Sequence, residues 1–176
     1  MTLQNVRVAV LVDRSFEDLE FWVPTMRLRE EGADVVIAGR EADHTVTGKH
    51  GLTATSTVAA RDLEADALDG VVVPGGWAPD KLRRDPGVTS LVRQLDDQNK
   101  IVGQICHAGL VGISAGIVEG RPATGSKGIK DDLENAGAQW VDEAAFRDEN
   151  RVWGRVVKDI PAFCRTLIAA FQARVA

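Results

Sequence analysis

Short runs of consecutive apolar residues alternate along the chain with segments of helical periodicity. Runs rich in valine and isoleucine are typical of strands buried on both faces of a parallel sheet. The predicted strands are residues 7–12, 34–38, 68–73 and 101–105, with shorter candidates at 139–141 and 151–152. This alternation predicts an α/β fold with a mostly parallel central sheet between two layers of helices.

The first helix is predicted directly after the first strand. Its periodic apolar residues are Leu19, Trp22, Val23 and Met26. We expect Ser15 to cap it together with Asp18, three residues further on. The helix is predicted to bend or break at Pro24 and to stop near Gly32.

Further helices are predicted downstream. Asp85 and Pro86 supply an N-cap and a first-turn proline for a helix that runs through Leu95. Others follow residue 105, stopping near Gly116, and cover 129–135. The closing helix has apolar residues at a helical spacing, namely Phe163, Leu167, Ala170 and Phe171.

No repeat or linker divides the chain, so residues 1–176 are predicted to form a single domain. The polar stretch 39–60 is expected to hold short antiparallel strands.

The composition narrows the class of protein. With 176 residues and 44% hydrophobic content, the chain is long enough to build a two-sided core. Its net charge of −5 argues against a nucleic-acid partner, because binding to the phosphate backbone needs a basic face. The N-terminus lacks a secretory signal, and no apolar run reaches the roughly 18 residues needed to cross a membrane. We therefore expect a cytoplasmic protein with no nucleic-acid or membrane partner.

Cys106 is the most informative residue of the chain. It follows the predicted strand 101–105 and precedes a helical stretch, so its side chain is expected in the crevice where open α/β sheets bind ligands. A helix N-terminus also favours the thiolate form, which is the nucleophile. The alternative is a small buried apolar residue, which is how we interpret Cys164 in the closing helix. We favour a reactive Cys106 with a lowered pKa.

Gly75 and Gly76 end the strand 68–73 at the same edge of the sheet. Glycine there lets backbone N–H groups approach a ligand closely, and with the N–H of His107 they are candidates for an oxyanion hole. The alternative is an ordinary tight turn.

Acidic and histidine side chains complete the candidate site. Glu17 and Asp18 follow the first strand, where a carboxyl near the thiol would accept or return its proton. The alternative is a pair of surface acids in a first helical turn. His107 is a candidate general base, although it needs a third group to orient its ring. Neither cysteine has the spacing of a zinc site, so we expect no metal and no cofactor.

Several blocks of the chain together resemble the DJ-1/PfpI superfamily, and most closely its PfpI branch. The blocks occur in the family's order over nearly the whole chain, at residues 16–20, 48–51, 73–80, 105–107, 113–116 and 128–132. The resemblance implies a flavodoxin-like α/β sandwich that assembles into homodimers or hexamers.

The resemblance also implies roles for single residues. Cys106 would be the nucleophile at a strained elbow, and Glu17 the protonated carboxyl beside it. Asp80 would match the acid that reaches His107 of a neighbouring subunit in PfpI-type oligomers. The chain departs from the family's pattern at 108–110, at Ser126-Lys127 and at Gly154-Arg155, which predicts a substrate pocket of its own.

We expect a cysteine enzyme that acts on small reactive carbonyls such as methylglyoxal, or on the glycated adducts that they form. The branch is variously described as proteases, stress proteins, glyoxalases or deglycases. Peptide hydrolysis is the alternative within enzymes and requires an oriented Cys-His-acid set. From another class, the alternative is a stress sensor or holdase whose Cys106 is reversibly oxidised.

Overall fold

In the computed structural model, which describes residues 2–175, seven strands form one sheet in the order β10-β11-β7-β6-β1-β2-β5. All neighbouring strands are parallel except β10 and β11. In sequence order the strands are β1 (Arg7–Leu11), β2 (Asp34–Gly39), β5 (Val58–Ala59), β6 (Gly70–Val73), β7 (Ile101–Ile105), β10 (Ala145–Asp148) and β11 (Arg151–Gly154). The predicted mostly parallel sheet is confirmed.

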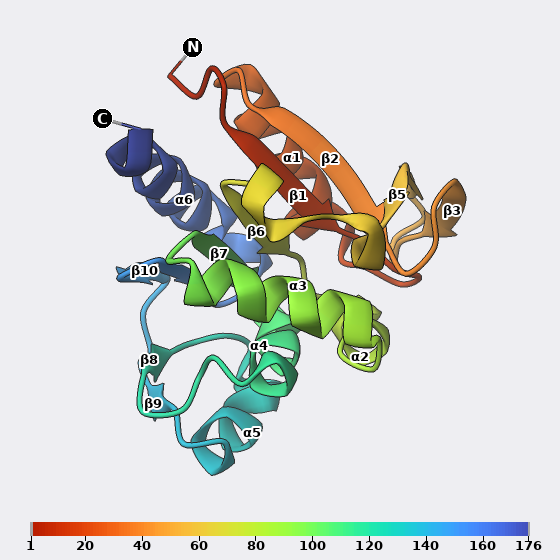
Figure 1. Cartoon of the computed structure of the whole chain (residues 1–176). Coiled ribbons are helices and arrows are strands. Elements are labelled where there is room, and N and C mark those ends of the chain that lie inside the picture. Colours follow the sequence, from red (N-terminus) through yellow and green to blue (C-terminus); the bar gives the residue numbers. More distant parts are fainter. Residues whose placement is uncertain (1, 176) are drawn as a thin grey trace.

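Helices cover both faces of this sheet, which makes three layers (Figure 1). On one face α1 packs against β2 and α6, and α6 also packs on β7, β10 and β11. On the other face α3 packs against β6, β7 and α4. Within residues 2–175 the α-helices are α1 (Asp18–Glu30), α2 (Ala78–Leu82), α3 (Pro86–Asp97), α4 (Gly109–Ala115), α5 (Lys130–Asn135) and α6 (Ile160–Val175).

Smaller elements lie outside the main sheet. Strands β3 (His44–Thr47) and β4 (Thr53–Ser56) form the antiparallel hairpin expected in the polar stretch. Strands β8 (Pro122–Ala123) and β9 (Gln139–Trp140) form a second small sheet. The 3₁₀-helices are η1 (Ala60–Asp62), η2 (Ala65–Ala67), η3 (Cys106–Ala108), η4 (Lys127–Ile129) and η5 (Val157–Asp159).

Several local predictions are confirmed. Asp85 caps α3, with its carboxylate accepting hydrogen bonds from the N–H groups of Gly87 and Val88. Gly116 ends α4 in the left-handed conformation that favours glycine. The apolar residues that mark the closing helix, Phe163, Leu167, Ala170 and Phe171, are all buried.

The start of α1 differs from the prediction. Glu17 is the N-cap, and its carboxylate accepts a hydrogen bond from the N–H of Glu20 at 2.8 Å. Ser15 lies before the helix with a φ of 63°, because its N–H donates to Thr47 and its carbonyl accepts from Trp77. The predicted pair of Ser15 and Asp18 is therefore wrong, and α1 continues through Pro24 as one helix.

The buried face of α1 also does not follow its most visible apolar periodicity. Leu19 and Met26 are 47% and 59% exposed, whereas Phe21 and Leu28 are buried. Glu20, with an exposure of 0%, lies on the same buried side. This rotation of the helix brings a carboxyl group into the interior at the carboxyl edge of the sheet.

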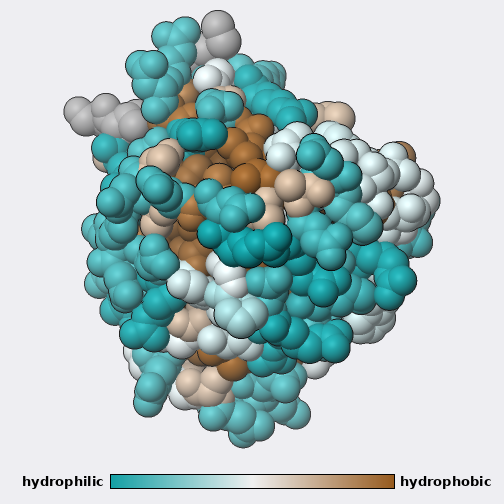
Figure 2. Space-filling model, turned by 45° about the vertical axis from the view of Figure 1, so that its right-hand side comes forward, coloured by the Kyte–Doolittle hydropathy of each residue, from teal (hydrophilic) through white to brown (hydrophobic). Residues whose placement is uncertain are grey.

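The surface in Figure 2 is mostly hydrophilic, with one hydrophobic area in its upper half. Among residues 2–175, no helix is both long and apolar enough to cross a membrane.

Candidate active site

Cys106 lies on a strained turn directly after β7, as the first residue of η3. Its φ is 61°, in the left-handed region that residues with a side chain rarely adopt. Two glycines make room for this turn. A Cβ at Gly75 would stand 2.7 Å from the Cβ of Cys106, and a Cβ at Gly125 would meet the Cys106 carbonyl. The elbow therefore depends on neighbours that have no side chain.

Backbone N–H groups surround the sulfur. Those of His107 and Gly76 form hydrogen bonds with the Cys106 side chain and act to lower its pKa. The N–H of Gly75 instead donates to Oε2 of Glu20 at 2.9 Å. Of the three predicted oxyanion donors, Gly76 and His107 face the sulfur, whereas Gly75 holds a carboxyl group.

The carboxyl beside the thiol belongs to Glu20 and not to Glu17. The carboxyl of Glu20 accepts a hydrogen bond from the N–H of Gly75 and lies close enough to Cys106 to raise the pKa of its thiol, while its Oε1 has no hydrogen-bond partner among the described residues. Glu17 caps α1, and its Oε1 lies 3.6 Å from Nε2 of His50. The predicted placement of Glu17 is therefore corrected, because one turn of α1 carries Glu20, three residues later, to the sulfur.

The ionisation of this pair differs from the prediction of a lowered thiol pKa. Burial and the charge of Glu20 raise the pKa of Cys106 to about 12, and these effects exceed those of the two N–H groups. Burial and the charge of Glu17 raise the pKa of Glu20 to about 7. The helix that follows is only the seven-residue α4, so its dipole is small. Near neutral pH the thiol keeps its proton, and Glu20 is poised to accept it.

His107 contacts the sulfur directly. Its Nδ1 lies 3.3 Å from Sγ of Cys106, and burial lowers the pKa of its imidazole. Its ring also lies 5.6 Å from the ring of Trp77. A neutral imidazole in this place is able to accept a proton at neutral pH.

Asp80 lies on α2, away from this cluster. Its carboxylate is more than half exposed and forms a salt bridge with Arg84 at 2.6 Å. Within the described chain it is therefore a surface group, and its predicted contact with His107 of another subunit stays a prediction.

A cavity of about 480 Å³ opens above the sulfur. Cys106, Glu20 and Glu17 lie at its inner end, and side chains from four other segments line it: Lys49, His50, Trp77, Ser126 and Lys158. Sequence reasoning missed Glu20, Lys49 and Lys158 as site residues. Among residues 2–175, no three His, Cys, Asp or Glu side chains are grouped as metal ligands.

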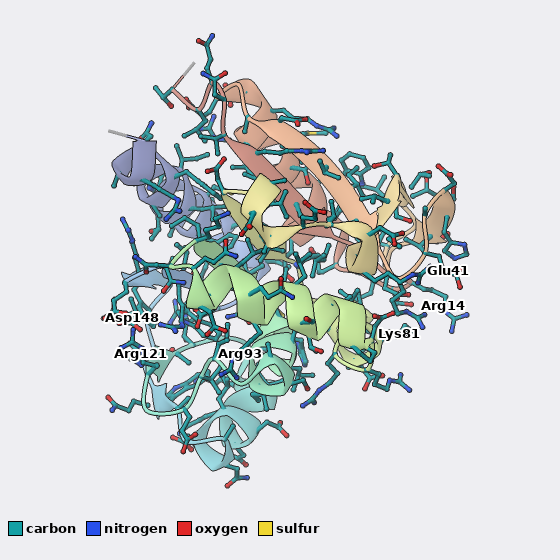
Figure 3. All side chains as sticks on the ribbon, viewed as in Figure 1. Arg14, Glu41, Lys81, Arg93, Arg121 and Asp148 are labelled. Atoms are coloured by element: carbon teal, nitrogen blue, oxygen red, sulfur yellow. The ribbon has the colours of Figure 1, made fainter. Side chains whose placement is uncertain are left out.

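A second cavity, of about 370 Å³, is lined mainly by basic side chains, including Arg14, Arg40 and Lys81. Figure 3 shows Arg14 and Lys81 near each other at the right of the molecule. Arg40 pairs with Asp13 and Arg84 with Asp80, so part of this charge is neutralised within the protein. Cys106 does not line this cavity.

The profile of the DJ-1/PfpI family matches residues 6–170, which is nearly the whole chain. The chain belongs to the DJ-1/PfpI family. It is 38% identical over 163 residues to a protein of Pyrococcus abyssi named as a deglycase, covering 93% of this chain and 98% of that one. It is 36% identical over 159 residues to YraA of Bacillus subtilis, which is named as a candidate cysteine protease, with coverages of 90% and 94%.

A solved structure supports the same assignment. The two-domain protein of Anabaena variabilis, with DJ-1/ThiJ/PfpI-like and ferritin-like domains, has a TM-score of 0.92 and 34% identity. The match covers 93% of this chain and 47% of that one. The predicted flavodoxin-like sandwich is confirmed, and the names of the relatives indicate a cysteine-based enzyme.

Proposed function

We propose that this protein is a cysteine-dependent enzyme that converts small reactive carbonyls to hydroxy acids, and that it acts on glycated adducts by the same chemistry. The observation that carries the proposal is the contact between the thiol of Cys106 and the buried carboxyl of Glu20. A weakly acidic thiol becomes a nucleophile when an adjacent base takes its proton during attack.

The first step is addition to the aldehyde carbon of a substrate such as methylglyoxal. The Cys106 sulfur forms an S–C bond while the thiol proton moves to Glu20. The carbonyl oxygen becomes an oxyanion, which the N–H groups of Gly76 and His107 stabilise. Glu20 then returns the proton to this oxygen, giving a hemithioacetal.

The second step is an internal redox rearrangement. His107 or Glu20 removes the proton from the hemithioacetal carbon, and the electron pair forms an enediol as the neighbouring ketone oxygen gains a proton. Protonation of the neighbouring carbon, with loss of the proton from the hydroxyl on the sulfur-bearing carbon, then gives the thioester of lactate. Water attacks the thioester, the S–C bond breaks, and the thiol is restored. In total, methylglyoxal and water give lactate and a proton.

Steady-state lactate formation from methylglyoxal by the wild type and by Cys106→Ser tests this proposal. We expect many turnovers per wild-type subunit and a rate lower by about a thousandfold for the variant. A wild type that consumes no more than one methylglyoxal per subunit would overturn the proposal, because it would act as a trap or sensor.

Peptide hydrolysis is the second candidate, favoured by the 3.3 Å contact between Cys106 and His107. A panel of short peptides measured with the same two proteins tests it. If peptides are cleaved faster than methylglyoxal is converted, the peptidase assignment replaces the first.

A further inference from the structure

We propose that the substrate carries a carboxylate or phosphate group at the end away from its reactive carbonyl, and that Lys49 and Lys158 at the cavity mouth bind this anion. The inference rests on the carbonyl chemistry proposed above and names the class of substrate.

The cavity is divided by charge. Its acids are at the inner end and buried, with exposures of 5% for Glu17 and 0% for Glu20. Its lysines are exposed at the outer end. A molecule whose carbonyl reaches Cys106 therefore presents its other end to two cations. This local charge is opposite in sign to the net charge of −5 of the chain.

Lys49 is held in place by its loop. The buried carboxylate of Asp18 accepts hydrogen bonds from the N–H groups of His50 and Leu52, at 2.9 and 2.7 Å. The N–H of Lys49 itself donates to Phe16 at 2.9 Å. Its Nζ lies 5.5 Å from the centre of the Trp77 ring, which packs near His107. The ammonium group therefore lies beside the Trp77 ring, which also lines the cavity.

Lys158 approaches from η5, at the other end of the sequence. Its neighbour Asp159 is fixed by Arg155, with Nε and Oδ2 3.0 Å apart. Neither Lys49 nor Lys158 forms a salt bridge with any residue in the range 2–175. Both ammonium groups are available to an anionic ligand.

Asp142, close to Lys158, already has a cationic partner, because it forms a salt bridge with Arg155 at 2.9 Å. Glu17 lies at the inner end, with its Oε1 3.6 Å from Nε2 of His50. They therefore offset the charge of the two lysines only in part.

An oxoaldehyde with an anionic tail reacts with the same stoichiometry as methylglyoxal. It takes up one water and becomes the corresponding hydroxy acid.

The test compares substrates that differ only in charge. The carboxylate arm compares dioxovalerate with its methyl ester, which has the same reacting oxoaldehyde. The phosphate arm compares hydroxypyruvaldehyde phosphate with hydroxypyruvaldehyde. We expect the wild type to prefer the anion in kcat/KM by about tenfold at low salt in at least one arm, and by less at high salt. The arm with the larger ratio identifies the anionic group.

Charge variants locate the effect. Lys158→Glu and Lys49→Gln should each lower the anion-to-neutral ratio by about threefold or more. Arg29→Glu is the matched control, because Arg29 is exposed at the other end of α1, and its ratio should equal that of the wild type. The ratio cancels general changes in the reactivity of Cys106.

A wild-type ratio near one in both arms would overturn this inference, as would ratios unchanged in both lysine variants. If the neutral substrates are converted in that case, the proposed carbonyl chemistry stands without the anion site. Conversion of neither charged nor neutral substrates would instead contradict the proposed function itself.

Discussion

The two cysteines occupy contrasting regions. Cys106 lies on the strained elbow after β7, whereas Cys164 lies in regular helix on the buried face of α6. Burial raises the pKa of both thiols, to about 12 and about 11 respectively. Proton affinity therefore does not separate them.

What separates the two thiols is their surroundings. Cys106 has a buried carboxyl, an imidazole and an open cavity around its sulfur. Cys164 is 4% exposed and belongs to the hydrophobic core. A thiol in such surroundings therefore becomes a nucleophile because a proton acceptor lies next to it and substrate can reach it. A low pKa of the thiol itself is not required.

Replacing each sulfur in turn should have the largest effect, and a different one at each cysteine. Cys106→Ser should lower methylglyoxal turnover on the order of a thousandfold with little loss of stability, because only the nucleophile changes. Cys164→Ser should keep the activity and lower the free energy of unfolding by about 1 to 3 kcal/mol, because a hydroxyl is buried among apolar groups. Lactate assays and urea denaturation measure the two effects. Similar losses of activity in both variants would contradict the assignment.

Removing the proton acceptor should have the next largest effect. Glu20→Gln should lower kcat/KM by about a hundredfold, and the wild-type rise in kcat/KM with an inflection near pH 7 should disappear. Glu17→Gln is the control. It should keep the inflection but move it to lower pH, because the charge of Glu17 helps to raise the pKa of Glu20. A pH profile unchanged by Glu20→Gln would exclude this role.

The same carboxyl should link stability to pH. The pKa of Glu20 is raised from 4.5 to about 7 in the folded protein. The contribution of Glu20 to the free energy of unfolding is therefore fully present below pH 4.5 and is lost as the pH rises through 7. Relative to Glu20→Gln, the wild type should lose about 3 kcal/mol between pH 4.5 and pH 8. Urea unfolding of both proteins across this range measures the difference. Parallel stability curves would show that Glu20 titrates normally.

All the groups discussed above belong to one chain, and variants of Asp80 test whether a second subunit contributes to the site. If Asp80 orients His107 of a neighbouring subunit, Asp80→Ala should lower turnover by about tenfold or more. Mixing Asp80→Ala with Cys106→Ser under conditions of subunit exchange should then restore part of the activity. Wild-type turnover in Asp80→Ala, or a fully active monomer, would contradict a shared site.

The helix α1 shows where prediction from sequence stopped. Apolar residues occur on both sides of this helix, so Leu19 and Met26 define one stripe and Phe21 and Leu28 another. Periodicity alone does not say which stripe is buried. The packed sheet and α6 bury the stripe that contains Glu20, whereas the family resemblance and the position of Glu17 after the first strand point to Glu17 as the carboxyl beside the thiol.

Local patterns of apolar, capping and turn residues were enough to predict the four central strands β1, β2, β6 and β7, the helices α1, α3, α4, α5 and α6 in their order, and the position of Cys106 at the carboxyl edge. They did not predict β5, β10 or α2. Only the tertiary structure decided which carboxyl meets the sulfur, which N–H groups face it, and which lysines stand at the mouth. These contacts join segments far apart in the chain. They depend on the rotation of α1 and on the close approach of backbone segments at the Cys106 turn, which local sequence patterns do not predict.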